Sequence, residues 1–105
     1  MIKYITYKEH KYPIKIGYYA IKMLKAETEK DIDEVFSDGV DITIFEPLLF
    51  YALVQGARYI DTPMVFKRED MEQVLDDCLF EFIELVPSFF PHLQQEKVKV
   101  TKKKE

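Results

Sequence analysis

The sequence has little of the chemistry that enzymes use. Its 105 residues include one cysteine, two histidines, three glycines and no tryptophan. Catalysis needs a nucleophile, a base or a metal ligand within reach of a second such group, but His10 falls in a predicted turn and His92 lies near a basic tail. The glycines are too far apart in the sequence to form a phosphate-binding loop. We therefore predict that the protein is not an enzyme.

The single cysteine, Cys78, excludes an internal disulfide and fits a reducing compartment. It lies on the apolar stripe of a predicted helix, where a small buried residue is expected rather than a nucleophile. Carboxylates cluster at 31–34, at Asp38 and Asp41, and at 76–77. None of these clusters has the alternating ligand spacing of a calcium loop. We expect no bound metal and no cofactor.

Long apolar runs are also missing. No stretch reaches the roughly 18 residues that a membrane span needs, and the first residues contain no apolar signal segment, so we expect no membrane partner. The net charge is −4. Residues 96–105 hold five lysines against Glu96 and Glu105, a balance of +3, which leaves −7 for residues 1–95. An acidic body repels nucleic acid. We predict one globular domain over 1–95 and a basic, disordered tail over 96–105.

The most distinctive feature that is present is a strongly apolar helix, predicted over residues 43–60. Apolar side chains run almost unbroken from Leu48 to Val54. A helix without a polar face belongs in the middle of a core. Thr43 and Glu46 have the spacing of a capping box, and Pro47 is tolerated in the first helical turn. We expect the rest of the chain to form a shell on this helix.

The other segments are apolar on one side only. β-Branched and aromatic residues at 2–7 and 12–16, with a polar run at 8–11 between them, predict a β-hairpin with a loop of about four residues. Pro13 requires an edge strand or an outward-facing position. Gly56 indicates that another element packs closely on the central helix, or that the helix frays early. Helical periodicity predicts further helices at 18–29, 31–37 and 68–86. The predicted fold is α+β, mainly α, with an N-terminal β-hairpin packed on three to four helices around the buried central helix.

Two apolar residues stand on the acidic side of the last predicted helix. Phe80 lies amid the carboxylates, and Ile83 lies at their border. Two interpretations remain open. In the first, residues 88–93 fold back over Phe80. In the second, an exposed apolar patch serves a partner. That patch would consist of Phe80, Ile83, Phe89 and Phe90.

A second candidate surface lies at the start of the helix predicted over 18–29. Tyr18 shares one side of this helix with Lys22 and Lys25, away from its apolar side. The candidate partner-binding residues are therefore Phe80, Ile83, Phe89, Phe90 and Tyr18.

One stretch resembles a known family. Residues 12–24 read YPIKIGYYAIKML. This extended Tyr-Pro-aliphatic-basic-aliphatic segment, followed by a glycine and an aromatic-rich helix start, resembles the opening of the tail assembly chaperones of long-tailed bacteriophages and prophages. The resemblance continues over the buried helix at 45–57. It includes the acidic helix at 67–91, which ends in Val-Pro-Ser-Phe-Phe-Pro, and covers residues 11–91 in all.

The resemblance implies a function without catalysis. Such chaperones bind the long, helical, aggregation-prone tape-measure protein in the host bacterial cytoplasm. They keep it soluble while tail tube subunits polymerise around it, and they are absent from the mature virion. The tape-measure protein is thus the implied partner. The tail tube protein and further copies of this chain are additional candidates.

The lysines at 102–104 add a hypothesis about expression. Lysine codons are A-rich, and an A-rich run favours ribosomal slippage. Because many of these chaperones are also made in a longer, frameshifted form, a longer form of this chain is a candidate partner. A plain solubilising tail explains the same lysines equally well.

Two other functions stay open on the sequence alone. A structural tail connector or completion protein would remain in the particle and be found in purified virions. A small acidic regulatory protein would instead bind a host partner and leave tails unaffected.

Overall fold

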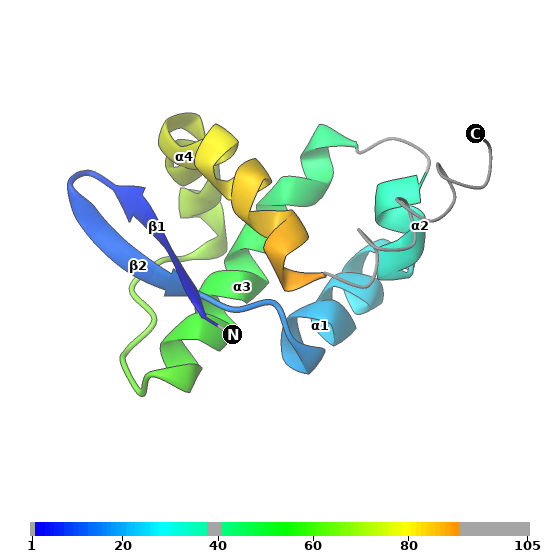
Figure 1. Ribbon diagram of the computed structural model, residues 1–105, viewed down its shortest axis with the longest axis horizontal. Coiled ribbons are helices and arrows are strands. Elements are labelled where there is room, and N and C mark those ends of the chain that lie inside the picture. Colours follow the sequence, from blue (N-terminus) through cyan, green and yellow to red (C-terminus); the bar gives the residue numbers. More distant parts are fainter. Residues whose placement is uncertain (1, 38–40, 91–105) are drawn as a thin grey trace.

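Two strands and four helices follow one another in the predicted order within residues 2–37 and 41–90, which the computed structural model describes. The elements are β1 (Lys3–Tyr7), β2 (His10–Ile14), α1 (Tyr18–Thr28), α2 (Ile32–Ser37), the 3-10 turn η1 (Ile42–Ile44), α3 (Phe45–Tyr59), η2 (Arg68–Asp70), α4 (Met71–Leu85) and η3 (Val86–Phe89). The β1–β2 hairpin packs on α3 and α4 (Figure 1). The predicted class, α+β and mainly α, is confirmed. The boundary predicted at residue 95 and the tail over 96–105 lie outside the described residues.

The apolar stretch forms α3, which contacts β2, α1 and α4. It runs between the hairpin and α1 (Figure 1). Leu48, Leu49 and Ala52 are completely buried, as expected for the central helix. The helix is not buried all round, however, because Phe50 and Val54 are only half-buried. A domain of this size has too few secondary-structure elements to surround α3 completely.

The structure identifies the residue that caps the start of this helical region. Asp41 is the N-cap of η1, and its carboxylate accepts hydrogen bonds from Thr43 N (3.0 Å) and Thr43 Oγ1 (2.7 Å). One turn of 3-10 helix, η1, then leads into α3. The spacing of Thr43 and Glu46 fits a capping box, but Asp41 precedes both and caps the earlier turn.

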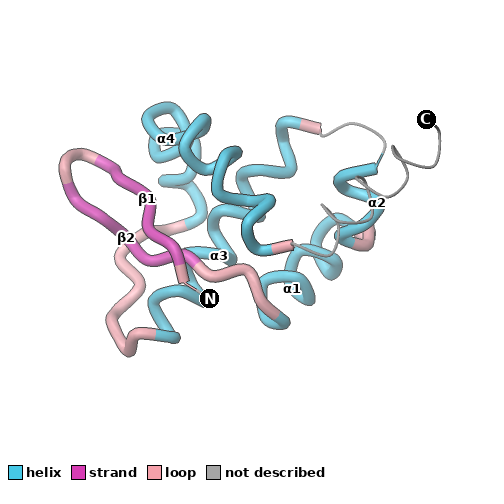
Figure 2. The backbone as a smooth tube through the Cα atoms, in the orientation of Figure 1, coloured by secondary structure: helices cyan, strands magenta, loops and turns pink. Residues whose placement is uncertain are grey.

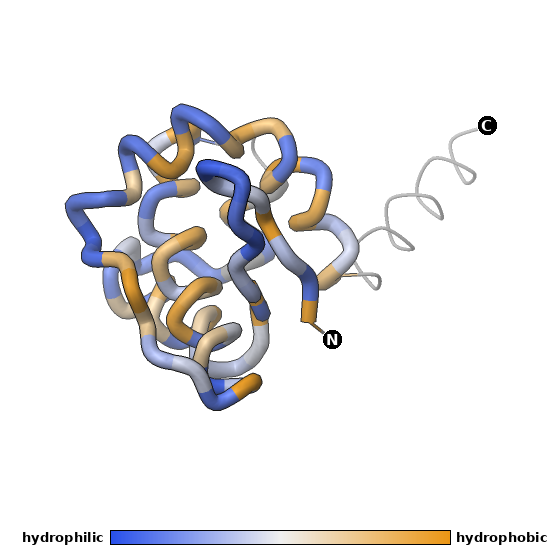
Figure 3. The backbone as a smooth tube through the Cα atoms, turned by 90° about the vertical axis from the view of Figure 1, so that its left-hand side faces the viewer, coloured by the Kyte–Doolittle hydropathy of each residue, from blue (hydrophilic) through white to orange (hydrophobic). Residues whose placement is uncertain are grey.

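The hairpin turn is shorter than predicted. Tyr7 pairs with His10, so only Lys8 and Glu9 form the loop. Their φ angles are 49° and 68°, as in the two-residue type I′ turn whose twist matches that of paired strands. Neither residue is the glycine or asparagine that signals such a turn in a sequence. Seen from the hairpin end, the turn is hydrophilic (Figure 3).

The outer edge of β1 is covered by α4. Thr6, opposite Lys11 in the register, donates its backbone N–H to Glu81 Oε1 at 2.8 Å, so the N–H at this position points away from β2. Pro13 lies opposite Tyr4, two residues beyond the Thr6–Lys11 pair. Hydrogen bonding alternates along an antiparallel pair, so neither of these two residue pairs exchanges hydrogen bonds between the strands. The missing N–H of Pro13 therefore removes no bond between the strands, and its predicted outward position is confirmed.

Gly56 marks the place where β2 touches α3. A Cβ atom on Gly56 would lie 2.4 Å from the carbonyl oxygen of Pro13 and 2.8 Å from Ile14 Cα. One turn earlier on α3, Ala52 O accepts a hydrogen bond of 3.0 Å from Lys15 N. The close-packing interpretation of Gly56 is confirmed, and the helix continues past it to Tyr59.

A side chain of α3 caps α1. Gln55 Oε1 accepts hydrogen bonds from Gly17 N and Ala20 N, both at 3.0 Å. Gly17, the residue before α1, has no side chain with which to cap the helix itself. The amide oxygen of Gln55 therefore satisfies N–H groups that a helix start leaves unpaired, and it fixes α1 against α3.

Replacing Gln55 by alanine should destabilise the domain by about 1–2 kcal/mol, since it removes a cap and leaves partly buried N–H groups without an acceptor. Urea unfolding followed by circular dichroism measures the change. Gln55→Glu keeps the acceptor oxygen and places a negative charge at a helix N-terminus, so it should retain more stability than Gln55→Ala. Equal losses in the two variants would contradict the capping role.

Candidate partner-binding surfaces

The described residues place few reactive groups where they could do chemistry. Cys78 is 1% exposed, and burial raises the pKa of its thiol to about 11, so little nucleophilic thiolate exists at neutral pH. The Arg68 guanidinium donates to Glu27 and holds the pKa of that carboxyl below its usual value. Within residues 2–37 and 41–90, no three His, Cys, Asp or Glu side chains gather to hold a metal ion.

The outward face of α4 presents the largest exposed apolar side chain of this helix. Phe80 is 78% exposed, and Ile83, three residues on, is 37% exposed. The opposite face of α4 is fixed in the core by four residues at intervals of three to four. These are Met71, Val74, Cys78 and Phe82. The backbone of Cys78 is not helical (φ −122°, ψ 16°), so α4 is kinked there. Phe80 lies after this kink and two residues before the buried Phe82, so the helical period of that stretch points it away from the core.

Carboxylates lie on both sides of Phe80 along α4. Asp76 and Asp77 precede it by four and three residues, before the kink at Cys78, and Glu84 follows it by one turn. All three are exposed. We call Phe80, Ile83 and these three carboxylates the α4 patch. A partner that covers the patch would bury the Phe80 side chain next to negatively charged carboxylates.

The chain after α4 corrects part of the predicted patch. Phe90 is only 4% exposed and belongs to the core, and Phe89 is half-buried against it. The reason is η3, in which Pro87 ends the α-helical pattern and turns the chain inward, with Phe90 N donating to Pro87 O at 3.0 Å. The predicted four-residue patch is thus wrong for Phe90. The alternative that residues 88–93 cover Phe80 is also not seen, because Phe80 stays exposed; residues 91–93 lie outside the described part.

Tyr18 is on a separate surface, at the first residue of α1. It is 80% exposed, and Lys22 Nζ lies 5.7 Å from the centre of its ring. A cation over an aromatic ring is a weak contact at an exposed site. Tyr18 and Lys22 therefore lie on the same side of α1, as predicted, but this contact does not identify a binding partner for the surface.

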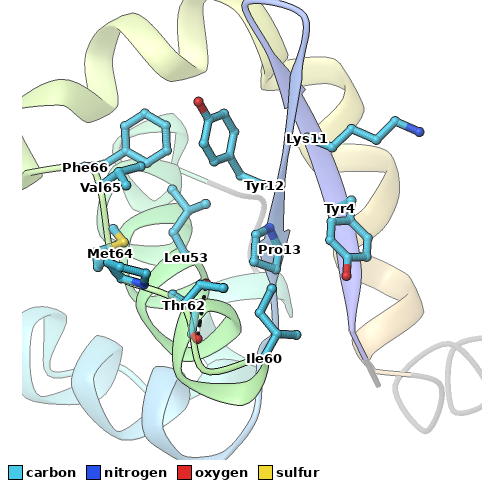
Figure 4. A pocket seen from close by; sticks show the side chains of 12 residues that line it. Tyr4, Lys11, Tyr12, Pro13, Leu53, Ile60, Thr62, Met64, Val65 and Phe66 are labelled. Carbon is cyan, nitrogen blue, oxygen red and sulfur yellow. Dashed lines mark hydrogen bonds between the residues drawn. The ribbon is translucent and has the colours of Figure 1, made fainter.

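Sequence reasoning missed an apolar groove between β2 and the segment that follows α3. This segment, residues 60–67, runs back beside β2 before α4 begins (Figure 2). The groove has a volume of about 300 Å³. Figure 4 shows the side chains around it. Its walls come from Tyr4, Lys11, Tyr12, Pro13, Leu53, Ala57, Ile60, Thr62, Pro63, Met64, Val65 and Phe66.

Aromatic contacts hold the outer wall of the groove. The Phe66 ring meets Tyr12 edge-on at 4.8 Å and Tyr7 at 5.9 Å between ring centres. Val65, next to Phe66, remains 64% exposed. The sequence does show an apolar run, Met64-Val65-Phe66, between two predicted helices. This run alone does not show which strand the segment packs against, so the groove could not be predicted from it.

Comparisons with protein-family models, curated proteins and solved structures found no match to this chain. None of the helices in the described part combines the length and the apolar character needed to cross a bilayer.

Proposed function

We propose that this chain is a tail assembly chaperone of long-tailed bacteriophages or prophages. In this role it binds the tape-measure protein in the host bacterial cytoplasm, without catalysis, and keeps it soluble until the tail tube forms around it. It then leaves, so it is absent from the mature virion. The resemblance of residues 11–91 to this family motivates the proposal.

The observation that carries the proposal is the exposure of Phe80 at 78% on a helix that is otherwise well packed. A chaperone for helical apolar segments needs an apolar surface that a partner helix can cover. It also needs charge around that surface, so that it does not aggregate itself. The α4 patch has both properties, because Phe80 and Ile83 stand beside three exposed carboxylates.

The small size of the patch suits a contact that must later be released. Burying one phenylalanine contributes about 1.5–3 kcal/mol, so the contact of one patch with one tape-measure segment is weak and breaks readily. Several copies bound along one extended tape measure would jointly keep it soluble, while a polymerising tube subunit could displace each copy singly.

The test is to express the tape-measure protein of the same gene cluster with and without this chain. We expect the tape measure to be insoluble alone, and soluble and co-purifying with several copies of the wild-type chain. Phe80→Asp should abolish this rescue by placing a charge in the contact. It should change the free energy of unfolding by less than about 0.5 kcal/mol, because Phe80 is exposed.

Val65→Asp is the matched control, since Val65 is 64% exposed and lies outside the α4 patch. It should rescue the tape measure as well as the wild type does. A folded Phe80→Asp that still solubilises the tape measure would contradict the role of the patch. If neither the wild type nor a longer frameshifted form yields a soluble complex, the chaperone proposal fails. Finding the chain in purified virions would favour a structural tail protein instead.

A further inference from the structure

The apolar groove has room for a large side chain. An apolar cavity of about 150 Å³ is enough to bind benzene, and the groove measures about 300 Å³. Its walls combine the aliphatic side chains of Leu53 and Ile60 with the rings of Tyr12 and Phe66 (Figure 4). A phenyl ring with one aliphatic neighbour therefore matches its size and its chemistry.

The charge at the groove specifies what should lie next to that ring. Among the described residues that line the groove, Lys11 alone is charged, and it is exposed. Tyr4, Tyr12 and Thr62 add hydroxyl groups to the lining. An aromatic side chain flanked by carboxylates is thus complementary to the groove in both polarity and charge.

The α4 patch has this combination. Phe80 and Ile83 supply an aromatic and an aliphatic group one turn apart, and Asp76, Asp77 and Glu84 supply the carboxylates. The patch cannot reach the groove of its own molecule. The core-facing side of α4 is fixed on α3 and β1, whereas the groove opens between β2 and the segment after α3 (Figure 4). Only a second copy can bring the two surfaces together.

We propose that, when no other partner is present, the α4 patch of one copy docks in the apolar groove of a second copy. Phe80 enters the groove, and Lys11 of the receiving copy faces the carboxylates of the patch. The two surfaces differ, so a pair held by one such contact keeps one free patch and one free groove. These either bind each other, which closes a two-fold dimer, or bind further copies. In both cases the contact competes with any other partner for Phe80. The inference concerns the chain alone and does not depend on the tape-measure proposal.

The first test is sedimentation velocity of the full chain alone over a wide range of concentration. The average mass should rise with concentration. Phe80→Asp and Val65→Asp should each remain monomeric, since one loses the patch and the other places an acid at the groove. Lys11→Glu should weaken association about tenfold or more by opposing like charges. Ile42→Asp, at an exposed position on η1 outside both surfaces, should associate as the wild type does.

The decisive experiment mixes two non-associating variants. Phe80→Asp keeps an intact groove, and Val65→Asp keeps an intact patch, so an equimolar mixture should form one-to-one pairs and nothing larger. Circular dichroism checks that both are folded; Lys11→Glu replaces Val65→Asp if the latter is not. A wild type that stays monomeric overturns the proposal, as does a mixture of folded variants that forms no pairs. Because Val65→Asp should still solubilise the tape measure, failure here is distinguishable from failure of the proposed function.

Discussion

Replacing Phe82 by alanine is expected to lower the free energy of unfolding by about 3–5 kcal/mol, the usual cost of deleting a fully buried ring. Phe82 is 0% exposed, and its ring meets that of Phe45 edge-on, with 6.2 Å between the ring centres. This contact joins α4 to the start of α3, so its loss leaves a cavity where the two helices meet. For a domain whose total stability is about 5–15 kcal/mol, such a loss is large. Urea unfolding at constant temperature would measure it.

Phe80→Ala is the matched control, because it makes the same chemical change two residues away on the same helix. Phe80 is 78% exposed, and the expected change is within about 0.5 kcal/mol. The difference between the two variants thus measures burial with residue type and helix held constant. Comparable losses in both would mean that Phe80 is covered in solution, which would remove the basis for the α4 patch.

Gly56→Val is expected to cost about 3 kcal/mol or more, at the upper end for overpacking. A Cβ there would meet the carbonyl of Pro13 at 2.4 Å and the Cα of Ile14 at 2.8 Å. These are main-chain atoms, so no side-chain rotation can relieve the contact. β2 must move off α3, and the hydrogen bond from Lys15 N to Ala52 O must lengthen or break. Thermal unfolding measures the loss, and faster hydrogen exchange of the Lys15 amide shows where it acts.

Gly17→Ala is the comparison for this prediction. Its Cβ would lie 2.5 Å from Gln55 Nε2, but that atom ends a flexible side chain that can turn away. The backbone of Gly17, with φ of −124°, is open to any residue. We expect a loss of about 1 kcal/mol, from a weakened cap on α1. A larger loss from Gly17→Ala than from Gly56→Val would show that the contact of β2 with α3 is looser than these distances indicate.

Periodicity allowed the long helices and their buried sides to be predicted from the sequence. In α4, the residues at intervals of three and four reach the core, and Phe80, off that period, reaches the surface. The apolar run in α3 likewise predicts a central helix, whereas Gly56 had two explanations, a close neighbour or early fraying, and the contact with β2 decides between them. The helical period and the apolar run are local, and the physical rule that places them needs only neighbouring residues.

The parts that were missed depend on residues far apart or on irregular backbone. Phe90 follows Pro87 in a 3-10 turn, where the α-helical period no longer tells which side faces inward. The sequence gives no sign that Gln55 caps another helix, because this role depends on α1 lying beside α3. The groove joins β2 to the segment after α3, more than forty residues later, and no local pattern shows that pairing. One candidate surface was thus predicted in part, and the other was not predicted at all.

The hydrogen bond from Thr6 to Glu81 spans 75 residues, and this matters while a ribosome is making the chain. Translation delivers β1 and β2 first and α4 last among the described elements. Until α4 emerges, the outer edge of β1 has no cover, and bare strand edges pair readily with other chains. Neighbouring nascent chains on one messenger RNA are most exposed to such pairing in this interval. We expect slow codons placed between the hairpin and α4 to lengthen this interval and to lower the yield of folded protein.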